Sequence, residues 1–233
     1  MCPAPDKIGP DLKTMLLLGT SNQNKVSEIL QITGLNPGCV ITPRKLNIQG
    51  EPVEDGDTFQ ANAIIKAMFY GTASGLPVLA EDTGLEVAAL DGQPGLRSAR
   101  FAGFGHDDRA NREKLIGLIR QVDDRSARFV CHAVMAVPVN ISIDFIPPGV
   151  RELSSQNDFR LFYAFGRVQG EIVTQEAGQG GFGYDPIFFF PGSGLTFAQI
   201  PQEQKNRISH RANAIRQILP LIRQICGEDL EGR

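Results

Sequence analysis

The chain has 233 residues, of which 42% are hydrophobic and 21% charged, and its formal net charge is −3. This length and composition are typical of one large globular α/β domain, and the weak negative charge argues against duplex nucleic acid as a partner. No apolar run approaches the ~20 residues needed to cross a bilayer, so we expect no membrane partner. The four cysteines lack metal-like or disulfide-like spacing, which favours reduced thiols and a cytoplasmic location.

The N-terminal half predicts strands and helices in alternation. Residues 1–13 read as a flexible arm, and the apolar run Met15–Leu18 predicts a buried strand. Residues 26–32 then predict a helix that stops at Gly34.

A second helix and strand follow. Asp57-Thr58-Phe59-Gln60 fits a capping box with Asp57 as the N-cap, which opens a helix over residues 61–68. Pro77–Ala80 predicts a strand that ends at the turn Glu81-Asp82-Thr83-Gly84.

The second half predicts locally paired strands, so the fold class is mixed α/β. The last helix starts after Ser209, and Pro220 predicts a kink or break in it. The other expected elements are a helix at 111–119, a strand at 127–135, antiparallel neighbours at 160–165 and 171–173, a polar surface excursion at 138–158, and a C-terminal tail at 228–233.

Three segments contain residue types suited to a phosphorylated ligand. Thr20 to Lys25 combine hydroxyls, amides and a lysine at a helix N-terminus, which suits an anion but also an ordinary capped turn. Glu81 and Asp82 suit a hard cation such as Mg²⁺, and Asp82 could deprotonate a water; an acidic turn is the plainer alternative. Glu54 could add a carboxylate, or lie in a solvated loop.

Basic residues occupy two places where they can meet phosphate or a base. Lys66 falls in an apolar helical stretch and either snorkels outward or points at a phosphate. Lys205, His210 and Arg211 flank the start of the last helix, where cations oppose the helix dipole. They are therefore either surface charge or a ligand site.

A glycine-rich segment, Gly178 to Gly183, formally matches G-x-G-x-x-G. We reject dinucleotide binding, because the segment that follows, Tyr184 to Pro191, predicts extended chain instead of the required helix. Phe182 and Tyr184 offer rings to a planar ligand.

Taken together, these segments resemble the inosine triphosphate pyrophosphatase family from about Met15 to Ile225. The motifs occur in the family's order: Thr20-Ser21-Asn22-Gln23-Asn24-Lys25, Phe59-Gln60-Ala61-Asn62-Ala63 with Lys66, Glu81-Asp82-Thr83-Gly84, Pro94 to Gly103, Gly181 to Phe188, and Ser209-His210-Arg211. Arg97 stands where an aromatic residue is frequent.

The resemblance implies a two-lobed α/β fold with a long central mixed sheet, a cleft between the lobes and a homodimer. It implies Mg²⁺-dependent hydrolysis of ITP, dITP or XTP to the monophosphate and pyrophosphate. The implied roles are Asp82 as proton acceptor and metal ligand, Glu54 as second metal ligand, and as substrate-binding residues Thr20, Ser21, Asn22, Gln23, Asn24, Lys25, Lys66, Thr83, Phe182, Gly183, Tyr184, Asp185, Lys205, His210 and Arg211.

Two alternatives stay open on the sequence. Arg97 or the 138–158 excursion could reshape the pocket for another modified or pyrimidine nucleotide. The chain could also bind a nucleotide without turnover, although a non-catalytic binder has no chemical need for Asp82, Glu54 and Lys66 together.

Overall fold

The computed structural model describes residues 15–103 and 105–227, so the predicted N-terminal arm and C-terminal tail lie outside the described residues. Within these ranges, no helix has the length and apolar character of a membrane span. The described residues form one mixed sheet in the order β2-β1-β3-β4-β6-β7-β8, with β5 paired to β6. Its strands are β1 (Leu16–Leu18), β2 (Val40–Ile41), β3 (Val78–Val87), β4 (Ser126–Pro138), β5 (Arg151–Gln156), β6 (Phe159–Ile172), β7 (Phe188–Phe190) and β8 (Leu195–Thr196).

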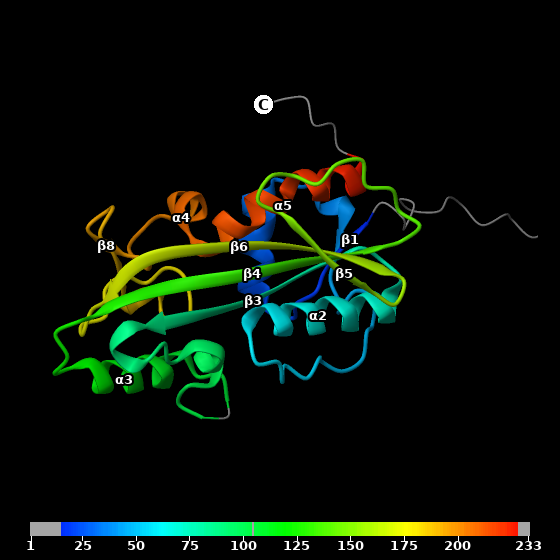
Figure 1. Ribbon diagram of the computed structural model, residues 1–233. Coiled ribbons are helices and arrows are strands. Elements are labelled where there is room, and N and C mark those ends of the chain that lie inside the picture. The colour runs from blue at the N-terminus through cyan, green and yellow to red at the C-terminus, as the bar shows by residue number, and fades with distance from the viewer. Residues whose placement is uncertain (1–14, 104, 228–233) are drawn as a thin grey trace, which may run out of the picture.

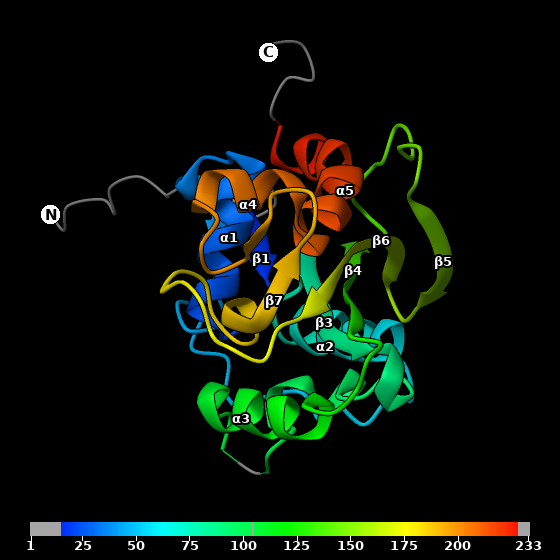
Figure 2. The same ribbon diagram turned by 90° about the vertical axis from the view of Figure 1, so that its left-hand side faces the viewer.

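Helices cover both faces of this sheet. In Figure 1, α5 lies above the long strands β3, β4 and β6, whereas α2 and α3 lie below them. Figure 2 shows α1 and α4 on the same side as α5. The helices are α1 (Gln23–Thr33), α2 (Phe59–Ser74), α3 (Asp108–Ile119), α4 (Gln202–Ile208) and α5 (His210–Cys226), with short 3-10 helices η2 (Pro37–Cys39), η3 (Ala88–Leu90), η4 (Gly95–Arg100) and η5 (Asp185–Ile187).

Three clusters of buried hydrophobic side chains hold the layers together. One joins α1 and α5 to the sheet, and a second joins α2 to its other face. The third lies at the far end of the long strands and includes Leu115 of α3 and Phe188 of β7. Because helices cover both faces of the sheet, consecutive residues of β3 place their side chains in two different environments.

The short strand β1 leaves part of β3 with one free edge. β1 runs parallel to β3 and pairs Leu17 with Val78 and Leu18 with Leu79 before it ends. β3 continues to Val87, paired on its other side with β4. At this edge the Leu79 carbonyl accepts the Gly19 N–H, and the Leu85 N–H donates to the Ser98 hydroxyl. Because the direction of the main-chain groups alternates from residue to residue along a strand, those of Glu81 and Thr83 point to the same edge.

The predicted mixed α/β class is confirmed, but two strand boundaries were wrong. Glu81 to Gly84 lie inside β3, not in a turn at its end. The strand needs a glycine at position 84, because a Cβ there would lie 2.5 Å from the Phe59 ring and 2.7 Å from the Gly95 carbonyl oxygen. The segment 160–165 and most of 171–173 belong to one strand, β6, which ends at Ile172 and pairs with β4 from Phe159 to Glu171. The 138–158 excursion contains the edge strand β5.

Helices α1, α2, α3 and α5 were predicted in place, with differences at their ends, whereas α4 was not predicted. Thr58, not Asp57, is the N-cap of α2, because its hydroxyl accepts the Ala61 N–H at 3.0 Å. The helix α1 starts at Gln23, three residues before the predicted start. Helix α5 continues unbroken through Pro220, because Ile218, Leu221, Ile222 and Ile225 are buried around it and that burial outweighs the lost backbone bond. After Tyr184 the chain forms η5 before β7, so only part of the predicted extended segment is extended.

Candidate active site

The turn between β1 and α1 gathers polar groups beside the free edge of β3. Asn22 caps α1, and its side-chain oxygen accepts the N–H groups of Asn24 and Lys25 at 3.0 and 3.2 Å. The Thr20 hydroxyl accepts from the Asn22 N–H, and the Ser21 hydroxyl donates to Glu51. The capped-turn alternative is therefore correct for Asn22. Ser21 to Asn24 are nonetheless exposed, and the first turn of α1 contains no acidic residue, so this end of the helix also suits an anion.

On the α2 face of β3, two carboxylates converge on one lysine. Lys66 Nζ lies 2.9 Å from Asp82 Oδ1 and 2.9 Å from Glu54 Oε2. The Asn62 amide donates to the other Asp82 oxygen at 3.2 Å. Burial alone would lower the pKa of Lys66, but Asp82 and Glu54 hold that pKa above its usual value. Lys66 therefore points inward as an ammonium, and Asp82 has both oxygens oriented.

On the opposite face, three carboxylates alternate with three cations. Glu81 follows the alternation of the strand to the α1 and α5 side, where Arg211 Nε lies 3.0 Å from its Oε1 and Lys25 Nζ 3.2 Å from the same oxygen. Arg211 also donates through Nη1 to Glu28 of α1. Lys205 Nζ lies 2.8 Å from Glu28 Oε1 and 2.6 Å from Asp185 Oδ2. The charges balance, which is what allows so many ions to be buried.

This network is almost dry. Arg211, Lys205 and Glu81 are each 2% exposed, and the Cys131 thiol donates to Glu81 at 3.0 Å. Burial opposes ionisation of Glu81, but Arg211 and Lys25 hold its pKa well below the usual value. Arg211 and Lys205 likewise outweigh burial and lower the pKa of Glu28. Glu81 and Glu28 are therefore ionised, and Arg211 is fixed by both of them.

His210 opens α5 in a buried, uncharged form. Its ring stacks on Phe129 with centroids 4.7 Å apart, and its Nδ1 has no hydrogen-bond partner among the described residues. Burial and the neighbouring Arg211 charge hold the pKa of His210 well below its usual value. A neutral imidazole cannot oppose the helix dipole, so His210 does not contribute to the electrostatic conflict expected from the sequence.

Gly166 of β6 allows the first turn of α5 to approach the sheet. A Cβ at this position would lie 2.1 Å from the His210 carbonyl oxygen and 2.4 Å from the Ala214 nitrogen. We predict that Gly166→Ala pushes α5 outward and lowers the free energy of unfolding by about 1–3 kcal/mol, as overpacking does. Denaturant unfolding measures this change. Gly117→Ala is the matched control, because Gly117 is helical with open space around it, and equal stability of the two variants would contradict the prediction.

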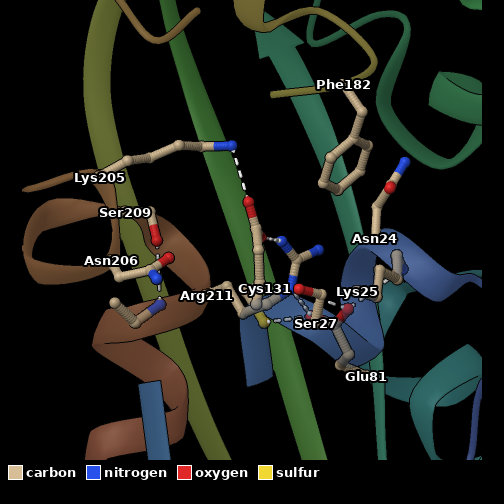
Figure 3. Close-up of polar contacts among 12 residues, drawn as sticks. Asn24, Lys25, Ser27, Glu81, Cys131, Phe182, Lys205, Asn206, Ser209 and Arg211 are labelled. Carbon is tan, nitrogen blue, oxygen red and sulfur yellow. Dashed lines mark hydrogen bonds and ion pairs between the residues drawn. The ribbon is translucent and has the colours of Figure 1, made fainter. Parts of the chain in front are cut away.

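The glycine-rich loop places one aromatic ring beside the two buried cations. The Phe182 ring centroid lies 5.2 Å from Lys205 Nζ and 5.7 Å from Arg211 Cζ, and Figure 3 shows the three side chains pointing toward one another. Asp185 accepts from both the Phe182 N–H and Lys205. Tyr184 differs from expectation: it is 5% exposed within the third core cluster, and its hydroxyl donates to the Ser98 carbonyl, so its ring is not open to a ligand.

The predicted residues thus form two groups on either side of β3. Asp82, Lys66 and Glu54 lie on the α2 face, whereas Lys205, Arg211 and Phe182 gather on the α1 and α5 side. Lys25, at the end of the polar turn, contacts the second group through Glu81. An elongated ligand with one anionic and one planar part matches this arrangement.

Comparison with known proteins identifies the family. The model of the Ham1 family matches residues 16–221. The chain belongs to the Ham1 family. Among its relatives, the dITP/XTP pyrophosphatase of Listeria monocytogenes serotype 4b (strain F2365) is 42% identical over 87% of this chain and 92% of its own length. The dITP/XTP pyrophosphatase of Haemophilus ducreyi (strain 35000HP / ATCC 700724) is 40% identical over 87% of this chain and 95% of its own.

Solved Ham1 structures agree with the fold. The Ham1 protein of Staphylococcus aureus superposes with a TM-score of 0.73 at 36% identity, covering 92% of this chain and all of its own. The Ham1 protein of Coxiella burnetii gives 0.74 at 32% identity, covering 89% of this chain and 98% of its own. The resemblance inferred from the ordered motifs is therefore confirmed.

Sequence reasoning missed several residues of this Ham1 site. Glu28 bonds both Arg211 and Lys205, yet it lies in a helix beside Lys25 and Ile29 and looks like a surface acid. Its burial together with Val26 and Ile29 is visible only in the structure. Asn62 was quoted within a motif, without the Asp82 contact that the structure reveals.

Proposed function

We propose that this Ham1 protein hydrolyses the deaminated purine nucleotides ITP, dITP and XTP to the nucleoside monophosphate and pyrophosphate, with Mg²⁺, in the cytoplasmic nucleotide pool. The observation that carries the proposal is the pairing of Phe182, Lys205 and Arg211 on one side of β3 with Asp82, Lys66 and Glu54 on the other. The names of the Listeria and Haemophilus relatives support it.

The buried cations support recognition of a keto-purine. Lys205 and Arg211 offer only donors, and the ion pairs of Arg211 use Nε and Nη1, which leaves Nη2 outside them. Hypoxanthine and xanthine present a carbonyl oxygen where adenine presents an amino group. An adenine would leave the donors unpaired in a dry site, and a site built on such a hydrogen bond discriminates by ~10⁴ or more. Phe182 provides a ring for the base to stack on.

The residues on the α2 face fit a magnesium ion. Glu54 and Asp82 are carboxylates within reach of one common cation, Lys66 Nζ, and Mg²⁺ is bound in proteins by one or two carboxylates together with substrate phosphates and waters. Asp82 and Glu54 would hold the ion. When bound, Mg²⁺ neutralises charge on the phosphate oxygens during phosphoryl transfer.

The protein's own residues provide positioning and proton transfer. Asp82 accepts the proton of the attacking water, and Lys66 and Asn62 keep its two oxygens oriented. Lys66 remains an ammonium and lies beside the charge that develops at phosphorus. Thr20 to Lys25, at the N-terminus of α1, bind the phosphate chain, and Thr83 meets the nucleotide at the free edge of β3. Positioning and electrostatics of this kind account for most phosphoryl-transfer catalysis.

A substrate panel tests the proposed specificity. We expect kcat/KM for ITP, dITP and XTP to exceed that for ATP by ~10³ or more with Mg²⁺, because the donor-lined pocket rejects an amino group. The panel includes dUTP, dTTP and methylated purine nucleotides. A preference for one of these would indicate that the substrate is another modified or pyrimidine nucleotide. Equal turnover of ATP and ITP would overturn the proposed specificity, and binding without hydrolysis would indicate a nucleotide-binding module.

The resemblance also supports a homodimer, which we include in the proposal. Sedimentation equilibrium of the full chain would give twice the 25.4 kDa chain mass, and a monomer at the concentrations used for assays would contradict it.

A further inference from the structure

Helix α3 makes two hydrogen bonds to Gly183, the residue of the glycine-rich loop that follows Phe182. The Asp108 carboxylate accepts the Gly183 N–H at 2.8 Å, and Arg112 Nη1 donates to the Gly183 carbonyl at 2.9 Å. These two groups belong to the two peptide planes that flank the Gly183 Cα. Gly183 has a φ of +63°, a conformation that glycine adopts without strain. Holding both planes fixes a residue whose backbone is otherwise free to adopt many conformations.

Arg112 also connects Glu176, which precedes the glycine-rich loop, to Gly183. Its guanidinium bonds both Glu176 oxygens, at 2.8 and 3.2 Å, while it donates to Gly183. A planar, bidentate contact of this kind constrains orientation as well as distance. The Arg112 side chain is only 14% exposed, so solvent weakens it less than an open surface pair.

Helix α3 is a firm base for these contacts. Asp107 caps it through the Ala110 N–H, and Leu115 and Ile119 are fully buried in the third core cluster. Phe182 is therefore held from two sides: its own N–H by Asp185, within the loop, and the next N–H by Asp108, from α3. The Phe182 ring in turn lies beside Lys205 and Arg211.

We propose that Asp108 and Arg112 are positioning residues for the base pocket, which set the place of the Phe182 ring against Lys205 and Arg211 and so tune purine selectivity. The inference rests on the proposed function. Neither residue touches the nucleotide; both act through Gly183. Small displacements of a positioning group can cost ~10²-fold in rate, so loss of either contact should be visible in the selectivity ratio.

The test compares Arg112→Met with Arg109→Met in the full chain. Arg109 occupies the same helix, but its side chain is 80% exposed and its guanidinium pairs with Glu113. We expect Arg112→Met to raise KM for ITP about tenfold and to lower the ITP-to-ATP ratio of kcat/KM about tenfold, with kcat changed less. Arg109→Met should match the wild type within about twofold. Asp108→Asn keeps an acceptor oxygen and should retain most of the selectivity, whereas Asp108→Ala should resemble Arg112→Met.

A double-mutant cycle with Phe182→Ala separates positioning from general destabilisation. If Arg112 acts through Phe182, the effect of Arg112→Met on selectivity disappears in the Phe182→Ala background. An undiminished effect there, or unchanged selectivity in Arg112→Met, would overturn the inference. If the wild type itself fails to hydrolyse ITP, the proposed function fails instead, and the two outcomes are distinguishable. Thermal unfolding of each variant checks that the fold persists.

Discussion

Asp82→Asn is expected to lower kcat for ITP by about 10²–10⁴-fold, the range that a positioned general base contributes. The amide cannot accept the proton of the attacking water, and it removes one of the two carboxylates that meet at Lys66. Because asparagine is nearly the same shape, the register of β3 with β4 should persist, while its single oxygen accepts from only one of the two donors, Lys66 and Asn62. Steady-state kinetics with Mg²⁺ give the loss, and circular dichroism checks the fold.

The matched control is Asp57→Asn. Asp57 is exposed and precedes α2, but Thr58 is the cap, so this variant should keep wild-type turnover. If Asp82→Asn kept near-normal kcat, the base would have to be another group. A folded Asp82→Asn protein that still binds ITP would separate lost chemistry from lost binding.

Arg211→Met is expected to destabilise the protein by about 3–5 kcal/mol, because it leaves Glu28 and Glu81 buried without their shared cation. For a domain of this size the loss corresponds to a fall in Tm of roughly 6–20 °C. Selectivity for ITP over ATP should fall as well, since the planar donor beside Phe182 is gone. Differential scanning calorimetry and the substrate panel measure the two effects.

Two further variants divide the roles of Arg211. Arg211→Lys keeps the charge but not the planar fork, so it should recover much of the stability and little of the selectivity. Arg207→Met removes an exposed arginine of α4 that pairs with Glu203 and should change stability by no more than about 0.5 kcal/mol. Wild-type stability in Arg211→Met would show that the buried acids find another partner.

Local chemistry made several features predictable from the sequence. Gly34 and the apolar stripe around Ile29 mark the end and the buried face of α1. After Gly183 the chain forms a 3-10 helix and a short strand, without the α-helix that a dinucleotide-binding segment requires. The order of the short motifs indicated the family, and the match of the Ham1 family model to residues 16–221 confirms it.

The rest depended on contacts between distant residues. Glu28 and Arg211 are separated by 183 positions, and nothing near Glu28 distinguishes it from a surface acid. Gly84 reads as a turn residue, yet it is small because Phe59 and the Gly95 carbonyl lie against it. Tyr184 reads as a base-stacking ring, yet its burial in the far core cluster and its bond to Ser98 only become visible in three dimensions.

Identification of the products of ITP hydrolysis in ¹⁸O-labelled water, by phosphorus NMR, tests the central claim most directly. In the proposed mechanism Asp82 activates a water that attacks the phosphorus next to the sugar, so we predict IMP that carries the label and unlabelled pyrophosphate. Release of orthophosphate, or label found in pyrophosphate, would contradict the account.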